Sequence, residues 1–233
     1  MSLADDLATQ VKKIFKDSWE TRDGQVVPEP ENLKLGNDAV EFKRATILYA
    51  DLSGSTALVD AKNWMFAAEV YKSFLHCAAK IIRAEGGAIT SYDGDRVMGI
   101  FVGDPQSNPA VRCGLKINHA VQKIVNPALL TQYPNSGFSV KQIVGIDTSE
   151  IRAARTGVRG GNDIVWVGRA ANYAAKLTDI DSETRTWITG DVYKMLNDDT
   201  KSNGTPKQSM WKEYKWDKCG NKQIFGSTWT WPV

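Results

Sequence analysis

Residues 45–56 read ATILYADLSGST. The first part, 45–51, is a mostly apolar run that ends in Asp51, which is typical of a buried strand. The glycine and the hydroxyl side chains that follow suit a tight turn and then the N-terminus of a helix. This stretch therefore predicts a strand, a loop and a helix in succession, with a carboxylate where the strand ends.

An amphipathic helix and a linker are predicted ahead of this unit. Apolar residues recur at helical spacing through residues 4–20, with charged residues between them. Residues 23–32 (DGQVVPEPEN) contain two prolines and an Asp-Gly pair, which interrupt regular structure. We therefore divide the chain into an N-terminal helix with a Pro-containing linker, 1–39, and a main domain, 40–233.

Helices and strands alternate through the rest of the main domain. A long helix is predicted over residues 57–84, because apolar residues share one face and two glycines follow it. The short apolar runs AITSY and RVMGIF flank Asp93-Gly94, a pair that favours a tight β-hairpin. Asp95 should then lie at the tip of that hairpin.

The second half of the domain continues this alternation. A helix is predicted over 107–125, strands over 138–147 and 151–156, and a turn over 159–162 before the strand DIVWV. The Ala-rich segment 168–177 (GRAANYAAKL) reads as a helix, followed by the strand RTWIT, a short helix and a Trp-rich tail of late strands. The pattern indicates an α/β protein of the α+β sandwich kind, with helices packed on a mostly antiparallel sheet rather than a doubly wound parallel one.

Composition excludes several classes of protein. Lys plus Arg number 29 against 27 Asp plus Glu, so the net charge of +2 gives no broad field for nucleic acid or an anionic membrane. The cysteines, Cys77, Cys113 and Cys219, are odd in number and form no C-x-x-C pair, which argues against a disulfide scaffold or a zinc site. No signal peptide is visible, and no apolar run approaches the ~20 residues that span a bilayer. We expect a cytoplasmic protein with no nucleic-acid or membrane partner.

Two aspartates are candidates for chemistry. Asp51 ends a strand, Asp95 tips the next hairpin, and the helix between them returns the chain to the same end of the sheet, so the two carboxylates can meet. Strand-end carboxylates suit a hard divalent cation such as Mg²⁺ bound to a phosphorylated ligand. Each aspartate alone is more often a solvated turn residue, so it is the pairing that favours a metal site.

Three segments in order, YADLSGST, SYDGDRVMGIF and VGRAANYAAKL, resemble the class III adenylate and guanylate cyclase domain. The resemblance covers roughly residues 40–233 and implies the ferredoxin-like (palm) fold of that family. It implies that Asp51 and Asp95 bind two divalent metal ions, Mg²⁺ or Mn²⁺, and that the substrate is a nucleoside triphosphate. Family members also work as dimers with active sites at the interface, so a homodimer is expected.

The same resemblance assigns roles to a helix. The family pattern of Asn, three residues and Arg falls on Asn172 and Lys176, so Asn172 is expected to orient the ribose. Lysine in place of arginine keeps the positive charge but loses the planar fork that contacts phosphate through two bonds. Arg169 and, in the tail, Lys222 are therefore further candidates for stabilising the phosphate charge.

This sequence departs from the family pattern at the positions that recognise the nucleotide base. Purine-using members carry a lysine ahead of the metal hairpin and an acidic residue, or Glu and Cys, near the Asn; here Ser91 and Val165 lie in those two regions. A site without placed polar groups cannot select a hydrogen-bonding purine edge. Tyr49 is bulky and shortens the pocket, which favours a pyrimidine. The chain thus resembles the bacterial pyrimidine cyclases of the Pycsar anti-phage systems.

This second resemblance implies that UTP is converted to cyclic UMP, which a separate cyclic-nucleotide-binding effector reads during anti-phage defence. The expected substrate contacts are Tyr49, Ser53, Gly54, Ser55, Thr56, Ser91, Val165 and Lys222. Alternatives are a cytidylate cyclase, an adenylate or guanylate cyclase, and an inactive nucleotide-binding regulatory module, which the lysine at position 176 would allow. A diguanylate-cyclase-like enzyme is disfavoured because the hairpin lacks a GG-[DE]-[DE]-F turn.

Overall fold

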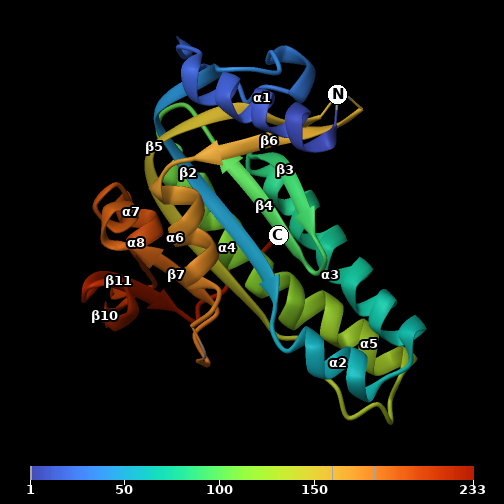
Figure 1. The fold of residues 1–233 in the computed structure, drawn as a ribbon. Coiled ribbons are helices and arrows are strands. Elements are labelled where there is room, and N and C mark those ends of the chain that lie inside the picture. Colours follow the sequence, from blue (N-terminus) through green and yellow to red (C-terminus); the bar gives the residue numbers. More distant parts are fainter. Residues whose placement is uncertain (1, 159, 181) are drawn as a thin grey trace.

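The fold is organised around one long central strand, β2 (Asp38–Leu52). It pairs antiparallel with β5 (Gln142–Val158) on one edge and with β4 (Arg96–Phe101) on the other. In the computed structural model, which describes residues 2–158, 160–180 and 182–233, the main sheet has the order β10-β11-β7-β5-β2-β4-β3 (Figure 1). Strand β1 joins the sheet beside β2, and β6 joins it beside β5.

The other strands complete this sheet and one small hairpin. They are β1 (Glu20–Asp23), β3 (Ala88–Asp93), β6 (Gly161–Val167), β7 (Thr186–Thr189), β10 (Lys212–Trp216), β11 (Lys222–Ser227) and the separate pair β8 (Ser202–Asn203) and β9 (Gln208–Ser209). Among the pairings of the described residues, β1 with β2 and β5 with β7 are parallel, and the rest are antiparallel. The mostly antiparallel sheet and the α+β class are therefore confirmed.

Helices cover both faces of the sheet (Figure 1). They are α1 (Leu3–Lys16), α2 (Ser55–Ala61), α3 (Trp64–Ala84), α4 (Ser107–Ala120), a π-helical turn (Val121–Val125), α5 (Asn126–Gln132), α6 (Arg169–Leu177), α7 (Gly190–Lys194) and α8 (Asp198–Lys201), with 3₁₀ turns at Pro30–Asn32 and Asp217–Cys219. Because side chains alternate along a strand, β2 contributes Leu48 and Ala50 to the core under α3 and α4, and Ile47 to the core under α6. Tyr49 and Asp51 therefore lie on the α6 face.

Helix α6 lies very close to β5. Its buried residues are three alanines, Ala170, Ala171 and Ala174, and Leu177. The strand beneath carries Gly145, where an added Cβ would lie 2.1 Å from the carbonyl oxygen of Ala174. A glycine at that position lets the helix backbone approach the sheet. This close packing holds the second half of α6 against β5.

The long helix predicted over 57–84 is two helices, so that prediction was wrong in its continuity. Helix α2 ends at Ala61, Lys62 is extended, and the side chain of Asn63 accepts a hydrogen bond from the Phe66 amide at 3.0 Å. An N-cap of this kind starts a new helix.

The helix predicted over 107–125 extends further than expected. Helix α4 continues into the π-helical turn and then into α5, with Pro127 in the first turn of α5. Proline cannot donate the usual helical hydrogen bond and clashes with the preceding turn, and a local widening of the helix relieves both effects. The chain therefore remains helical through a proline.

The strands predicted over 138–147 and 151–156 are one strand, β5, which begins at Gln142. Its ladder with β2 runs from Gln142 to Ala154, and the irregularity lies in β2, between Phe42 and Ala45. The sequence suggested a break at residues 148–150. Pairing with the long strand β2 keeps these residues extended, so β5 is continuous. Of the turn predicted at 159–162, Arg159 lies outside the described residues, while Gly161 and Asn162 begin β6.

The N-terminal region forms a helix and also a strand that was not predicted. Helix α1 ends at Lys16, earlier than expected, and none of its residues is buried. The residues of strand β1 are all polar and exposed, and the strand pairs in parallel with the start of β2, so backbone hydrogen bonds rather than a hydrophobic pattern form it. Across the described residues, none of the helices has the combined length and apolar character needed to cross a membrane.

Candidate active site

The two predicted carboxylates come from adjacent parts of the sheet. Asp51, near the end of β2, pairs in register with Arg96 of β4. In the β3–β4 hairpin Asp93 pairs with Arg96, which leaves Gly94 and Asp95 as the two turn residues, and Gly94 has a positive φ of 60°. The expected hairpin thus forms, and Asp95 lies at its tip, next to the strand that holds Asp51.

The environment of Asp51 is unfavourable for a negative charge. Burial is the main reason that its pKa rises from 3.8 to about 6, and the charge of Asp95 raises it further. The guanidinium of Arg96 and the hydroxyl of Thr178, which donates a hydrogen bond to Asp51 at 3.4 Å, oppose the rise without cancelling it. Two carboxylates held this way would gain from a bound cation.

A bound metal ion would take its ligands from these two carboxylates and from the phosphates of the enzyme's substrate. Within the part of the chain that the structure describes, no group of three or more His, Cys, Asp or Glu side chains is arranged to hold a metal. Mg²⁺ is usually bound through one or two carboxylates with the remaining ligands from water and substrate phosphates. The Asp51 and Asp95 pair fits that kind of binding.

Arg96 is a site residue that sequence reasoning missed. Its Nη1 lies 4.0 Å from Asp51 Oδ2, its Nη2 lies 3.6 Å from Asp93 Oδ2, and its guanidinium lies over the ring of Tyr49 at 5.6 Å. Burial raises the pKa of Tyr49, although the Arg96 charge opposes the rise. The sequence places Arg96 directly after the hairpin tip, but only the register of β2 with β4 sets it opposite Asp51.

The loop after Asp51 lies at the same end of β2. The Ser53 amide donates to the Lys141 carbonyl at 2.8 Å, and Gly54, with a φ of 76°, precedes α2 without a capping side chain. Ser55 and Thr56 form the first residues of α2. The backbone amides of that first turn have no helical partner and are available to a phosphate group.

Asn172 and Lys176 are both exposed on α6. The opposite side of the helix packs on the sheet, and Thr178, which caps α6, is the residue that contacts Asp51. Residues spaced by four lie on one face of a helix. Asn172 and Lys176 therefore point away from the sheet.

Arg169 has structural partners. It donates to the buried carboxylate of Asp147 at 3.1 and 3.3 Å, to the Thr148 carbonyl at 2.7 Å, and pairs with Asp191 at 2.8 Å. These contacts fix the first residue of α6 to β5 and α7. Lys222 lies nearby, 5.7 Å from the ring of Tyr173, and lines a 190 Å³ cavity with Arg169.

Ser91 and Val165 lie on strands that are far apart in the sheet. Ser91 lies on β3 opposite Met98, just after a register shift, and Val165 lies on β6 opposite Ala154. The order of the sheet inserts β4, β2 and β5 between these two strands. A single subunit therefore does not bring the two positions together.

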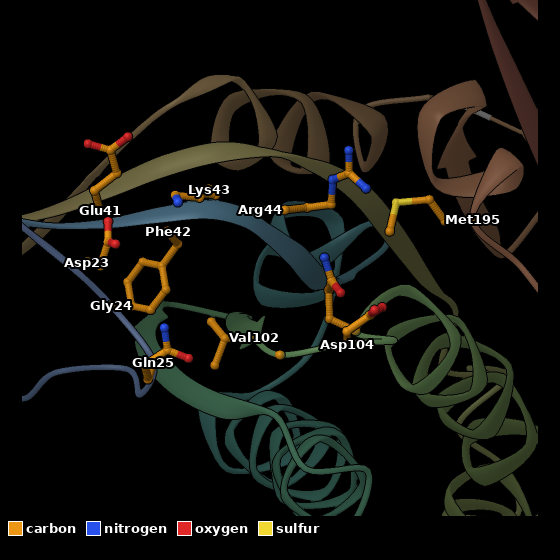
Figure 2. Close-up of a pocket in the computed structure, with 12 residues that line it drawn as sticks. Asp23, Gly24, Gln25, Glu41, Phe42, Lys43, Arg44, Val102, Asp104 and Met195 are labelled. Carbon is orange, nitrogen blue, oxygen red and sulfur yellow. The ribbon is translucent and has the colours of Figure 1, made fainter.

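A cavity of 520 Å³ lies toward the other end of β2 (Figure 2). It opens between β1 and the end of β4, where the irregular part of β2 contributes Lys43 and Arg44, and Asp104 and Met195 line its other side. None of the predicted site residues lines it. The cavity is thus separate from the carboxylate pair.

Solved structures with the same fold are nucleotide cyclases. The adenylyl cyclase CyaB of P. aeruginosa has a TM-score of 0.66 and 21% identity, covering 81% of this chain and 95% of that one. The guanylyl cyclase Cya2 has a TM-score of 0.65 and 21% identity, covering 81% and 93%. The fold is therefore that of the class III nucleotide cyclase domain, as predicted.

Sequence relatives narrow the class. No protein-family model matches the chain. Over the full length of both proteins it is 50% identical to a uridylate cyclase of Burkholderia cepacia and 49% identical to one of Xanthomonas perforans. A uridylate cyclase of Rhodovulum sp. is 36% identical over 94% of this chain and 92% of the relative. The chain belongs to the uridylate cyclase family of nucleotide cyclases.

Proposed function

We propose that this protein converts UTP into 3′,5′-cyclic UMP and pyrophosphate. The observation that carries the proposal is the pair of carboxylates, Asp51 and Asp95, held together at one end of β2 with the pKa of Asp51 raised to about 6. Full-length identity of about half to proteins named as uridylate cyclases supports the choice of substrate.

Asp51 and Asp95 would hold two divalent ions, Mg²⁺ or Mn²⁺. When bound, such ions lower the pKa of the ribose 3′-hydroxyl and neutralise charge on the triphosphate. The chain's own groups then position the reaction: the backbone amides of Ser55 and Thr56 bind phosphate oxygens, and the 3′-oxygen is held in line with the α-phosphorus. The bond from that phosphorus to the pyrophosphate oxygen breaks as the new P–O bond forms.

A homodimer would complete the site. Asn172 and Lys176 are exposed on the outer side of α6, which supports their reaching the carboxylate pair of a second subunit. Asn172 would orient the ribose, and Lys176 would stabilise the charge that grows on the phosphoryl oxygens. A two-fold dimer of this kind contains two equivalent sites.

The base preference follows from the chemistry of Arg96. An arginine offers only hydrogen-bond donors, and Arg96 is held over the Tyr49 ring at 5.6 Å, beside the carboxylate pair. Uracil presents two carbonyl acceptors, whereas cytosine presents an amino donor in place of one of them. A donor-only side chain therefore favours UTP over CTP.

The first test identifies the product. Purified protein is incubated with Mn²⁺ and ATP, GTP, CTP or UTP, and products are identified by mass spectrometry beside an Asp51→Asn control of the same shape. Cyclic UMP that disappears in the control supports the proposal, and cyclic CMP would make the protein a cytidylate cyclase. A cyclic purine would overturn the base argument. Nucleotide binding with no product from any of the four would favour a regulatory module.

The biological role would be signalling to a separate effector with a cyclic-nucleotide-binding domain, in defence against phage. Support comes only from resemblance to the pyrimidine cyclases of anti-phage systems. Plaque counts on a bacterium carrying the natural operon, with the intact gene or with Asp51→Asn, test this role. Equal plaque counts would contradict it.

A further inference from the structure

Two adjoining cavities flank α3 on the face of the sheet opposite α6. The first, of 570 Å³, lies between α3 and the helical segment formed by the π-helical turn and α5. The second, of 410 Å³, lies between α3 and β3. Lys72 and His76 line both cavities, so the two adjoin at these side chains, and together we call them the α3 groove.

The first part of the α3 groove is mostly apolar. Its walls include Val70, Ile124, Val125, Leu129 and Val140. Two of these, Ile124 and Val125, belong to the π-helical turn before Pro127, and π-helical turns recur at functional sites. A volume of 570 Å³ is within the range of about 300–1,000 Å³ that holds small organic ligands.

The second part of the groove is cationic. Lys72, Lys80 and Arg83 line it at helical spacing on one side of α3. Among the described residues none of the three forms an ion pair, since Glu85, the carboxylate next to the end of α3, is held by Arg112 and Lys116. These cations remain available to an anionic ligand.

The groove therefore has an apolar end and a cationic end. The acidic side chain in its lining, Glu69, lies at the apolar end and accepts a hydrogen bond from the Tyr133 hydroxyl. An anionic group is repelled from that end and attracted to the other, so the charges set the direction in which an elongated ligand lies.

We propose that the α3 groove binds a small amphiphilic anion, a medium-length acyl or alkyl chain with a carboxylate or phosphate head. The chain occupies the apolar part beside Ile124 and Leu129. The head lies between Lys72, His76 and Lys80. Because the groove lies on the face opposite α6, the ligand binds without covering Asn172 or Lys176, and the proposal does not depend on the proposed reaction.

Cys77 offers a direct assay of occupancy in the full-length protein. Its thiol lines the apolar part and is partly exposed, whereas Cys113 is fully buried and Cys219 lies outside the groove. Burial raises the pKa of Cys77, so alkylation by N-ethylmaleimide is followed at one fixed, mildly alkaline pH. Peptide mass spectrometry reports Cys77 and Cys219 separately.

Dodecanoate below its micellar concentration is the first probe. At ten times its dissociation constant it should slow alkylation of Cys77 about tenfold, because protection follows one plus the ratio of free ligand to that constant, and should leave Cys219 unchanged. Dodecanol, which has the same chain and no charge, should protect much less. Dodecyl phosphate, compared with dodecanoate, distinguishes a phosphate from a carboxylate head.

Two variants separate the two ends of the groove. Lys72→Gln with Lys80→Gln should abolish the advantage of dodecanoate over dodecanol, and Ile124→Lys should weaken both. Ile124 is 49% exposed, so the substitution is compatible with folding; thermal denaturation verifies this. The exposed Lys123, which does not line the groove, provides the matched control Lys123→Gln.

Several results would overturn the proposal. These are no protection of Cys77 by any probe, equal protection by dodecanoate and dodecanol, or equal protection of Cys77 and Cys219. Protection that appears without a probe and grows with protein concentration would also overturn it, because a second copy of the chain would then cover the groove.

Discussion

Asp51 is the residue whose surroundings show most clearly how the site is built. It lies on the α6 side of β2 with Asp95 beside it and Arg96 across from it. Its raised pKa means that the folded protein binds a proton there more tightly than the unfolded chain does. Stability and ion binding at this residue should therefore depend on pH.

Asp51→Asn should stabilise the metal-free protein at pH 8. The folded pKa of about 6 lies above the ordinary 3.8, so the contribution of Asp51 to stability is most favourable below 3.8 and is lost as pH rises through 6. Thermal denaturation at pH 8 and at pH 4.5 measures this. The variant should melt above the wild type at pH 8, with a much smaller difference at pH 4.5; a difference independent of pH would refute the assignment.

Divalent ions should stabilise the wild-type protein at neutral pH. Mn²⁺ added to metal-free protein at pH 7.5 should raise the melting temperature, and a chelator should reverse the rise, because a ligand that binds only the folded state shifts the equilibrium. The rise should shrink at pH 5, where protons compete for Asp51. Asp51→Asn and Asp95→Asn should each reduce it, and an undiminished rise in both would show that the ions bind elsewhere.

Arg96→Lys should alter base selectivity. Lysine keeps the charge near Asp51 but loses the planar group over Tyr49. The ratio of kcat/KM for UTP to that for CTP should fall by about ten- to a hundredfold, since one charge-assisted hydrogen bond is worth about 1.5–3 kcal/mol. Steady-state kinetics with both substrates decide the point. An equal loss for UTP and CTP would mean that Arg96 acts through Asp51 alone.

At the scale of elements, α6 connects the two halves of the proposed chemistry. Arg169 anchors its first turn to Asp147 and Asp191, its alanines lie on the sheet, and Thr178 at its end contacts Asp51. A shift of this helix would move Asn172 and Lys176 together. The packing of α6 on β5 therefore determines the positions of both residues.

Gly145→Ala should displace α6. The new methyl group would lie 2.1 Å from the Ala174 carbonyl, and an overpacked position of this kind costs about 1–3 kcal/mol. We expect a lower melting temperature and a large loss of cyclase activity. The matched control is Gly161→Ala on β6, where the nearest atom is 3.8 Å away. Similar losses of melting temperature and activity in both variants would contradict a special role for the packing of α6 on β5.

The elements also show what local pattern predicts. The β3–β4 hairpin and α6 were predicted closely, because turn residues and helical periodicity are local signals. The break at Asn63 and the extension of α4 through Pro127 were missed, because caps and helix widening compete with periodicity. Strand β1 has no hydrophobic alternation and forms because β2 offers it a free edge.

At the scale of the whole molecule, the parts of the proposed site lie on separate elements on one face of the sheet. The carboxylates lie at the end of β2, whereas Asn172 and Lys176 are exposed on α6. We propose that a single chain does not close these groups around one nucleotide. Activity should therefore require two subunits that exchange them.

Mixing two inactive variants tests this exchange. Asp51→Asn and Lys176→Ala should each have little activity alone, and a mixture equilibrated from dissociated subunits should recover about a quarter of wild-type activity. Half of the dimers are then mixed, and each has one intact site of two. Cyclic UMP formation is the readout, and mixing with an Asp51→Asn, Lys176→Ala double variant is the control. No recovery would contradict shared sites.

The sequence by itself determined the α+β class, the hairpin and the positions of Asp51 and Asp95 at one end of the sheet. Those features follow from alternation, turn chemistry and chain order, which are local or nearly local. It also carried the resemblance to nucleotide cyclases, because the three segments keep their order along the chain.

The tertiary structure alone decided which distant groups meet. Arg96 reaches Asp51 through the register of β2 with β4, Arg169 is held by Asp147 and Asp191, and the α3 groove forms where a π-helical turn lies beside α3. Each contact joins segments far apart in the chain, and a shift of one residue in a strand turns a side chain to the other face. Local sequence patterns do not fix such registers, so only the packed fold places these side chains together.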